Sequence, residues 1–292
     1  WNDLLSRSEV CDAFQTYEWA QVQKNSMSAE PRFLIIRNGG EAVGGVLFFR
    51  SKLFGILDSN EIRGGPLYVQ GNKGAIMEKI LEVFRLRKGR SFYSLFVPSP
   101  LINRVFREMF EAEGYHPLTF RTVIIDLKRS LEEIWRVLDK KARWGVRKAK
   151  NLHVEVKIAN DWQEWEDYYR LHTVHSVRKK IHTYPRRYFQ EMFKLHRKNM
   201  CRLFTAKYGT RIIAGSLFLI YRENMIFLQN ASSEDSLKYN PNNLIQWASI
   251  EWAKENRVTI YDMNGLPLEE TPYLRGVYDY KKRWDGYVQW YY

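Results

Sequence analysis

Two side chains near the end of the chain have the types and spacing to do chemistry together. A β-branched and aromatic run at 258–261 predicts a buried strand that ends at Asp262. Thr271 can cap, and Pro272 can start, a short helix that carries Lys281 back to the end of this strand. A lysine ammonium stabilises negative charge on a reacting oxygen, and a carboxylate accepts a proton. Because sites in α/β sheets usually lie where strands end, we expect Lys281 and Asp262 to form a catalytic site.

The same two residues also allow structural interpretations, and the residues alone leave both open. Lys281 begins a Lys-Lys-Arg run, and charge runs of this kind are most often solvated turns. Asp262 can cap the turn at the end of its strand instead of acting as a base. Asp279 is a second carboxylate in the same segment.

A basic helix is expected in the middle of the chain. Ser130 and Glu133 have the spacing of a capping box, which predicts a helix over residues 131–150. Arg143 and Arg147 are four residues apart and therefore share one helix face. Such a face suits the phosphates of RNA or of a diphosphate-linked substrate, and the alternative is a solvated helix. The candidate phosphate ligands are Lys140, Arg143, Arg147 and Lys148.

The composition indicates a folded protein with an anionic partner. The 292 residues suffice for two ordinary domains, and apolar residues make up 45% of the chain. Lys and Arg outnumber Asp and Glu by 46 − 33 = 13. This imbalance favours RNA, a nucleotide-linked substrate or an anionic membrane face as the partner.

Neither the cysteines nor the histidines have the spacing of a metal site. Cys11 and Cys201 show no ligand spacing, so we expect reduced core residues of a cytosolic protein. His172 and His175 lie three apart without an acidic third ligand, so no metal is expected. No apolar run reaches the about 20 residues that span a bilayer, and no signal-like segment opens the chain. The expected location is therefore cytoplasmic, with at most peripheral membrane contact.

The chain repeats itself once. The hydrophobic pattern that begins at Arg32 and passes through Gly45 matches the pattern that begins at Arg202 and passes through Gly215. The offset is constant, because 202 − 32 and 215 − 45 both give 170. We therefore expect a duplicated helix–hairpin–strand–helix–strand unit. The first domain would cover residues 1–128 and the second 129–292, with 286–292 a terminal strand that packs on the first domain.

The periodicity places helices and strands in both copies. The expected helices are 8–27, 72–86, 100–112, 131–150, 162–180, 186–198 and 242–255. The expected strands are 32–37, 41–50, 61–69, 91–97, 120–127, 153–158, 202–207, 211–221, 224–230 and 258–261.

The end of the chain resembles the Fem-type aminoacyltransferases, which extend peptidoglycan bridge peptides using aminoacyl-tRNA. Their signature is a Tyr-Asp-x-x-Gly strand end followed by an aromatic-Lys-x-x-aromatic segment. Here these positions are Tyr261, Asp262, Gly265, Tyr280, Lys281 and Trp284. The resemblance implies an α/β (α+β) fold of two tandem GNAT-like acyltransferase domains with mixed sheets and a substrate groove between them. It also implies aminoacyl-tRNA as donor and an amine of a nucleotide- or lipid-linked cell-wall precursor as acceptor.

The resemblance also implies residues that bind the acceptor. Arg178 matches a family arginine that precedes a Tyr-Phe pair, here beginning at Tyr188, and helps to hold a diphosphate. Its family partner is a lysine near the N-terminus, where this chain has Gln23 with Lys24 beside it. Gln229 completes the expected substrate-binding set. Lys281 would stabilise the carbonyl oxygen or contact the terminal phosphate of the tRNA, and Asp262 would act as base.

A coenzyme A donor is not expected. Ordinary GNAT enzymes hold its pyrophosphate on a glycine-rich turn at a helix N-terminus. Residues 70–75 lack the first of these glycines, and 237–243 contain none. The prediction is therefore a monomer with no cofactor, aminoacyl-tRNA as co-substrate and no DNA partner. Two alternatives stay open: an N-acyltransferase with another donor or acceptor, and a non-catalytic RNA-binding protein.

Overall fold

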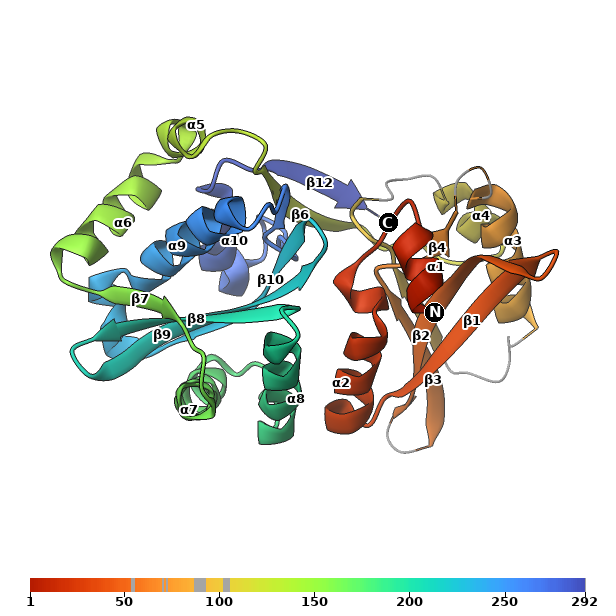
Figure 1. Ribbon diagram of the computed structural model, residues 1–292, viewed down its shortest axis with the longest axis horizontal. Coiled ribbons are helices and arrows are strands. Elements are labelled where there is room, and N and C mark those ends of the chain that lie inside the picture. The colour runs from red at the N-terminus through yellow and green to blue at the C-terminus, as the bar shows by residue number, and fades with distance from the viewer. Residues whose placement is uncertain (54–55, 70, 72, 87–92, 102–105, 292) are drawn as a thin grey trace. The chain divides into compact units, whose positions relative to one another are not determined.

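The computed structural model describes residues 1–53, 56–69, 71, 73–86, 93–101 and 106–291. Contacts divide the chain into two units, Trp1–Phe120 with Trp290–Tyr292, and Arg121–Gln289. Two separate sheets run through the molecule, one of five strands and one of seven (Figure 1). Within the described ranges, none of the helices combines the length and apolar character that a bilayer-spanning segment needs.

The first unit is built on a sheet with the order β1–β2–β3–β5, in which β4 pairs with β2. A Cβ at Gly44 would overlap Ile76 of α3, whereas a Cβ at Gly45 would approach Trp1, so α1 and α3 lie on opposite faces (Figure 1). Its elements are α1 (Asn2–Arg7), η1 (Ala13–Gln15), α2 (Tyr17–Met27), β1 (Glu30–Asn38), β2 (Glu41–Leu53), β3 (Leu57–Arg63), β4 (Leu67–Tyr68), α3 (Lys73–Arg85), β5 (Tyr93–Val97) and α4 (Arg107–Ala112).

The second unit carries a sheet with the order β12–β6–β11–β10–β9–β8–β7. Helices α7 and α8 cover one face, and α6, α9 and α10 lie on the other (Figure 1). Its elements are β6 (Phe120–Asp126), α5 (Leu131–Val137), α6 (Lys140–Asn151), β7 (Glu155–Ile158), α7 (Trp162–Lys179), α8 (Arg186–Arg197), β8 (Cys201–Tyr208), β9 (Arg211–Tyr221), β10 (Asn224–Ser232), η2 (Glu234–Tyr239), α9 (Pro241–Glu255), β11 (Ile260–Asp262), η3 (Pro272–Leu274), α10 (Arg275–Lys282) and β12 (Tyr287–Tyr291).

The two hairpins show the internal repeat directly. Ile35 lies opposite Gly45 in the first hairpin, and Thr205 lies opposite Gly215 in the second. Both hairpins shift register at the same place, after Ile36 and after Ala206, and 206 − 36 again gives 170. Because register and bulge position coincide at one constant offset, the two hairpins are copies of one unit.

One strand belongs to a different sheet than expected. The sequence predicts that the first domain ends at residue 128, after the strand that the structure shows as β6. This strand instead pairs antiparallel with β11, with Asp126 opposite Ile260. Its inward side chains Val123 and Ile125 are fully buried in the second core. The division therefore lies at Phe120.

Capping residues break two helices that the periodicity joined. The expected helix 8–27 starts anew at Thr16, whose hydroxyl accepts a hydrogen bond from the backbone of Trp19. The expected helix 131–150 divides into α5 and α6, because the Asp139 side chain caps a new start. The Ser130–Glu133 capping box is present as predicted.

Three further expected elements differ in their limits. The strand 61–69 divides into β3 and β4 around Gly64, which has a φ of +80°. Thr271 makes no side-chain cap, and the last helix begins as the 3₁₀ turn η3 before α10. Within the expected helix 100–112, α4 starts at Arg107. Residues 70, 72, 91–92 and 102–105 of the expected elements and glycine turn lie outside the described residues.

Candidate active site

The second sheet forks between β10 and β11. These strands run parallel, and their last paired residues are Ile226 and Asp262. β11 ends there, whereas β10 continues to Ser232, past a bulge between Phe227 and Gln229 in its pairing with β9. We call this point, where β10 and β11 separate after Ile226 and Asp262, the strand fork. A bulge next to a strand end redirects side chains and often marks a functional site.

Lys281 is buried at the strand fork. Its side chain is 8% exposed, and its Nζ donates hydrogen bonds to the carbonyl oxygens of Asn264 and Gly265, the latter at 2.7 Å. Both acceptors lie in the turn after β11 and have positive φ angles, +53° and +35°, which Asn and Gly adopt more readily than other residues. The Nζ also lies 5.8 Å from the centre of the Phe227 ring.

Burial changes the acidity of this lysine. Desolvation lowers the pKa of Lys281 to about 8, and the nearby Asp262 carboxylate partly opposes that change. At pH 7 the group therefore remains mainly protonated. Lys282, the next residue, is exposed. Lys281 therefore points into the protein beside the fork, and Lys282 points into solvent.

Asp262 caps the turn at the end of its strand. Its Oδ1 accepts a hydrogen bond from the backbone amide of Asn264 at 2.6 Å and another from the Thr122 hydroxyl. The structural interpretation of this aspartate is thus observed. Its carboxylate nevertheless remains beside Lys281, so it contributes negative charge at the fork.

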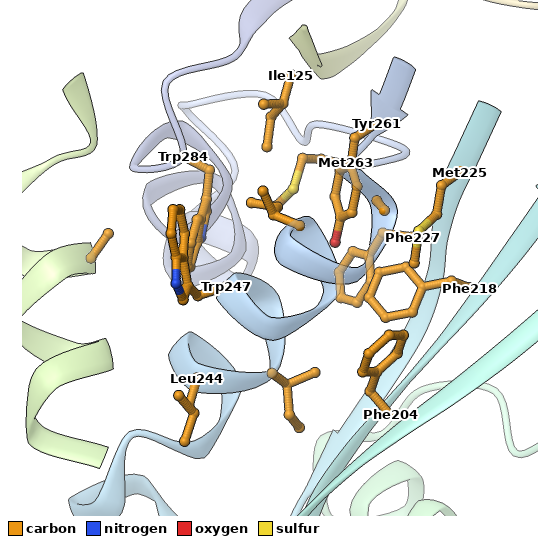
Figure 2. Packing of buried hydrophobic residues seen from close by; sticks show 14 of the residues in the cluster. Ile125, Phe204, Phe218, Met225, Phe227, Leu244, Trp247, Tyr261, Met263 and Trp284 are labelled. Carbon is orange, nitrogen blue, oxygen red and sulfur yellow. The ribbon is translucent and has the colours of Figure 1, made fainter. Parts of the chain in front are cut away.

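A buried polar network holds this end of the chain against α9. The Tyr261 hydroxyl contacts Gln246 Nε2 at 2.5 Å and Ser249 Oγ at 2.7 Å. The Tyr280 hydroxyl donates to the backbone carbonyl of Asn242 at 3.0 Å. Figure 2 shows Tyr261 and the fully buried Trp284 in the hydrophobic cluster around α9. The aromatic residues on either side of Lys281 therefore position α10.

Sequence reasoning missed Gln246 and Ser249. They are polar residues three apart in a helix whose neighbouring residues are largely apolar, so they share the face that packs on the sheet. That spacing was a usable signal. Their partner Tyr261 lies 15 and 12 residues away along the chain, on the strand that follows α9.

The expected acceptor residues have separate surroundings. Arg178 lies on α7 and donates to the carbonyl oxygen of Ser232 at 2.9 Å, 3.7 Å from Glu234. The side-chain nitrogen and oxygen of Gln229 are buried and form no hydrogen bond to any described residue. Both side chains thus lie along the part of β10 that continues beyond the fork.

Two other expected acceptor residues have surroundings of their own. Tyr188 is 1% exposed and stacks on Tyr184 at 4.4 Å. It is a core residue between α7 and α8, with almost no surface left for a substrate. Lys24 is exposed on α2 in the first unit.

The basic helix α6 presents most of its charge to solvent. Arg143 is an exception, since it donates to the carbonyl oxygens of Trp135 and Arg136 at the end of α5. Arg147 lies over the Trp135 ring at 5.6 Å. Within the described part of the chain, none of the lysines and arginines of α6 forms an ion pair. They are Lys140, Lys141, Arg143, Arg147, Lys148 and Lys150. The same described ranges contain no group of three or more His, Cys, Asp or Glu side chains that could hold a metal ion.

A family model described as the acetyltransferase (GNAT) domain matches residues 136–282, about half of the chain. The chain belongs to this family. The matched residues include α6, the strand fork and Lys281.

Known proteins agree on the fold. Over 118 residues the chain is 25% identical to UDP-N-acetylmuramoylpentapeptide-lysine N(6)-alanyltransferase of Weissella viridescens, a match that spans 40% of this chain and 35% of that relative. The crystal structure of FemX matches with a TM-score of 0.78 and 16% identity over 99% of this chain and 92% of that one. A tandem GNAT protein from the clavulanic acid biosynthesis pathway matches with a TM-score of 0.58 and 11% identity over 99% and 91%. The resemblance to the Fem-type family and the fold class of two tandem GNAT-like domains are confirmed.

Proposed function

We propose that this protein transfers an aminoacyl group from aminoacyl-tRNA to an amine of a cell-wall precursor or related acceptor. The observation that carries the proposal is the buried Lys281 ammonium at the strand fork, within a GNAT domain that resembles an alanyltransferase. The amine attacks the ester carbonyl, so a C–N bond forms and the carbonyl oxygen becomes negative. The C–O bond to the tRNA then breaks, and the proton lost by the amine ends on the departing hydroxyl. Lys281 would stabilise the negative oxygen.

The start of α9 supports a donor other than coenzyme A. Its first residue is Pro241, which has no backbone N–H to offer a phosphate. A Cβ at Gly145 would lie 2.7 Å from the Asn243 side chain, so the backbone of α6 lies directly against the first turn of α9. The unpaired cations of α6 are instead suited to the phosphates of an RNA donor.

The acceptor is proposed from the relative and from β10. The Weissella viridescens relative is named for a muramoylpentapeptide lysine, which is an amine on a nucleotide-linked wall precursor. Arg178 Nε is buried and makes no hydrogen bond to a described residue, so this guanidinium keeps a donor for a diphosphate. Gln229, on the same stretch of β10, would hydrogen-bond the peptide part of such an acceptor.

The test is a transfer assay with charged tRNA. The protein is incubated with aminoacyl-tRNA and a cell extract of small acceptors, and mass spectrometry identifies molecules that gain an aminoacyl mass. Uncharged tRNA and acetyl-CoA serve as control donors. Products that form only with charged tRNA would support the proposal. Products that form with acetyl-CoA would favour the N-acyltransferase alternative, and tRNA binding without product would favour a non-catalytic RNA-binding protein.

A further inference from the structure

The outward side of α7 changes from polar to aliphatic along its length. One line of side chains runs along this helix at spacings of three and four, and its last member lies two residues after the helix ends. The line consists of Gln163, Asp167, Arg170, Val174, Val177 and Ile181. Gln163 donates to Asp167 at 3.0 Å, and Arg170 lies 3.7 Å from the same carboxylate. This first half is an ordinary solvated surface.

The second half of the line is an exposed apolar surface, which we call the aliphatic tip (Val174, Val177 and Ile181). The three side chains are 67%, 70% and 52% exposed. The opposite side of α7 buries Trp165, Tyr168 and others against the sheet, so the tip is not part of that core. Single exposed apolar side chains are common. Three in one line, however, form an apolar patch whose exposure to water is unfavourable in free energy.

The backbone holds the tip in place. Lys180 has a φ of +53°, its amide donates to the carbonyl of Val177, and the amide of Ile181 donates to the carbonyl of Ser176. This is the hydrogen-bond pattern of a Schellman helix end. Ile181 is therefore fixed one turn beyond Val177 and does not belong to a loose loop.

Two exposed lysines, Lys179 and Lys180, lie within the segment of the aliphatic tip. Residues 171–187 contain no Asp or Glu and five lysines and arginines: Arg178, Lys179, Lys180, Arg186 and Arg187. Arg178 lies near Glu234, and Arg186 pairs with Glu166. Among the described residues, Lys179 and Lys180 form no ion pair, whereas Arg187 lies beside Trp162 and Lys194, at the other end of α7. The patch thus combines exposed aliphatic groups with charge that the protein itself does not neutralise.

We propose that the aliphatic tip and its two unpaired lysines, Lys179 and Lys180, dock this protein on an anionic lipid surface. The transfer of aliphatic side chains from water to the boundary between lipid headgroups and acyl chains is favourable in free energy. Long basic side chains can at the same time reach the anionic headgroups. RNA is a poorer fit, because it would use the cations and leave the three aliphatic side chains in water. If the proposed function holds, on which this step rests, docking here favours a lipid-linked acceptor over a soluble nucleotide-linked one.

Vesicle flotation tests the docking surface without any need for turnover. Wild-type protein should float with vesicles of phosphatidylglycerol and phosphatidylcholine, release as salt rises, and ignore phosphatidylcholine alone. The variant Val174→Ser/Val177→Ser/Ile181→Ser should bind at least about tenfold more weakly, and Lys179→Gln/Lys180→Gln should also bind more weakly. The matched control is Leu118→Ser/Val137→Ser/Leu237→Ser, which removes three exposed apolar groups that are scattered along the chain and should bind like wild type.

Several results would overturn the inference. They are an absence of wild-type flotation, equal flotation of the tip variant and wild type, or equal losses in the tip and control variants. A concentration-dependent dimer that disappears in the tip variant would show a second copy as the occupant, and loss of RNA binding with intact flotation would show RNA. Transfer to a soluble acceptor and to a lipid-linked acceptor is measured separately from flotation. Flotation without transfer would refute the proposed function alone, whereas transfer without flotation would refute the docking surface alone.

Discussion

Each unit has a parallel strand pair, β3–β5 in the first and β10–β11 in the second, and the two pairs end differently. In the first unit, β3 and β5 stay paired up to Arg63 and Val97, the last residues of both strands. The amide of Gly64 then donates to the carbonyl of Val97, which closes the pair further. In the second unit the pairing stops at Ile226 and Asp262 while β10 continues. In a closed pair the two strands satisfy each other's backbone hydrogen-bonding groups. Beyond a fork, those backbone groups must find hydrogen-bond partners on other residues.

The helices that follow these strands differ in the same way. α4, after β5, buries none of its residues, whereas α10, after β11, buries Lys281. One copy of the duplicated unit thus has a closed strand end, and the other has a carboxylate and two carbonyl groups that accept hydrogen bonds from a buried cation. The comparison indicates that both copies of the duplicated unit share the same strand arrangement. The polar site is present where the β10–β11 pair separates.

The largest test of this comparison is the loss of Lys281. Lys281→Met keeps the side-chain length and removes the charge, so turnover should fall by roughly 100- to 1,000-fold, as when one oxyanion-stabilising group is lost. Acceptor binding should change far less, because the interaction is strongest in the transition state. Rates at saturating substrate measure this.

Lys282→Met is the matched control, since Lys282 is exposed one position along. It should have a mild effect. Equal losses at both positions would mean that only a basic turn is required. Denaturant unfolding of both variants separates a catalytic loss from a loss of folded protein.

A second test uses the pKa of the buried lysine. Because burial lowers the pKa of Lys281 to about 8, the cation is present below that pH and lost as pH rises through it. The rate per neutral acceptor amine should be flat below pH 8 and fall by about tenfold per unit above it. The residual rate of Lys281→Met should lack this fall. A decline that persists in the variant would assign it to another group.

Paired glycine substitutions test whether the two hairpins are equivalent. A Cβ at Gly45 would overlap the backbone carbonyl of Leu34, and a Cβ at Gly215 would lie 2.6 Å from the Tyr168 ring. Gly45→Ala and Gly215→Ala should each lower the free energy of unfolding by about 1–3 kcal/mol. Gly74→Ala, where the added Cβ meets open space, is the control. If either hairpin glycine tolerates alanine as well as Gly74 does, close packing is not the reason that both copies have it.

The smallest expected effect concerns the unpaired charge of α6. Arg147→Ala should weaken tRNA binding a few-fold and reduce the slope of log affinity against log salt by about 1. Lys79→Ala in the first unit removes a lysine that pairs with Glu82 at 2.7 Å and should leave both unchanged. Filter binding across a salt series compares them. Identical behaviour of the two variants would remove α6 from RNA recognition.

The sequence by itself determined the local features. The hairpins, their 170-residue repeat and the Ser130 capping box follow from turn residues, strand alternation and caps, which act over a few neighbouring residues. It also placed Lys281 near Asp262, because the short strand and the short helix leave few paths by which the intervening chain can fold back to the strand end. The limits of elements were less certain where a cap such as Asp139 interrupts a continuous hydrophobic pattern.

Only the tertiary structure decided how the fork is built. The Thr122 hydroxyl meets Asp262 across 140 residues of chain, and Arg121 reaches the carbonyls of Leu266 and Pro267 across a similar span. Such contacts depend on which strand becomes the neighbour of β11, and β6 is as suitable for either sheet by its apolar pattern alone. The burial that lowers the pKa of Lys281 follows from that choice, because desolvation is a property of the assembled core and not of any segment.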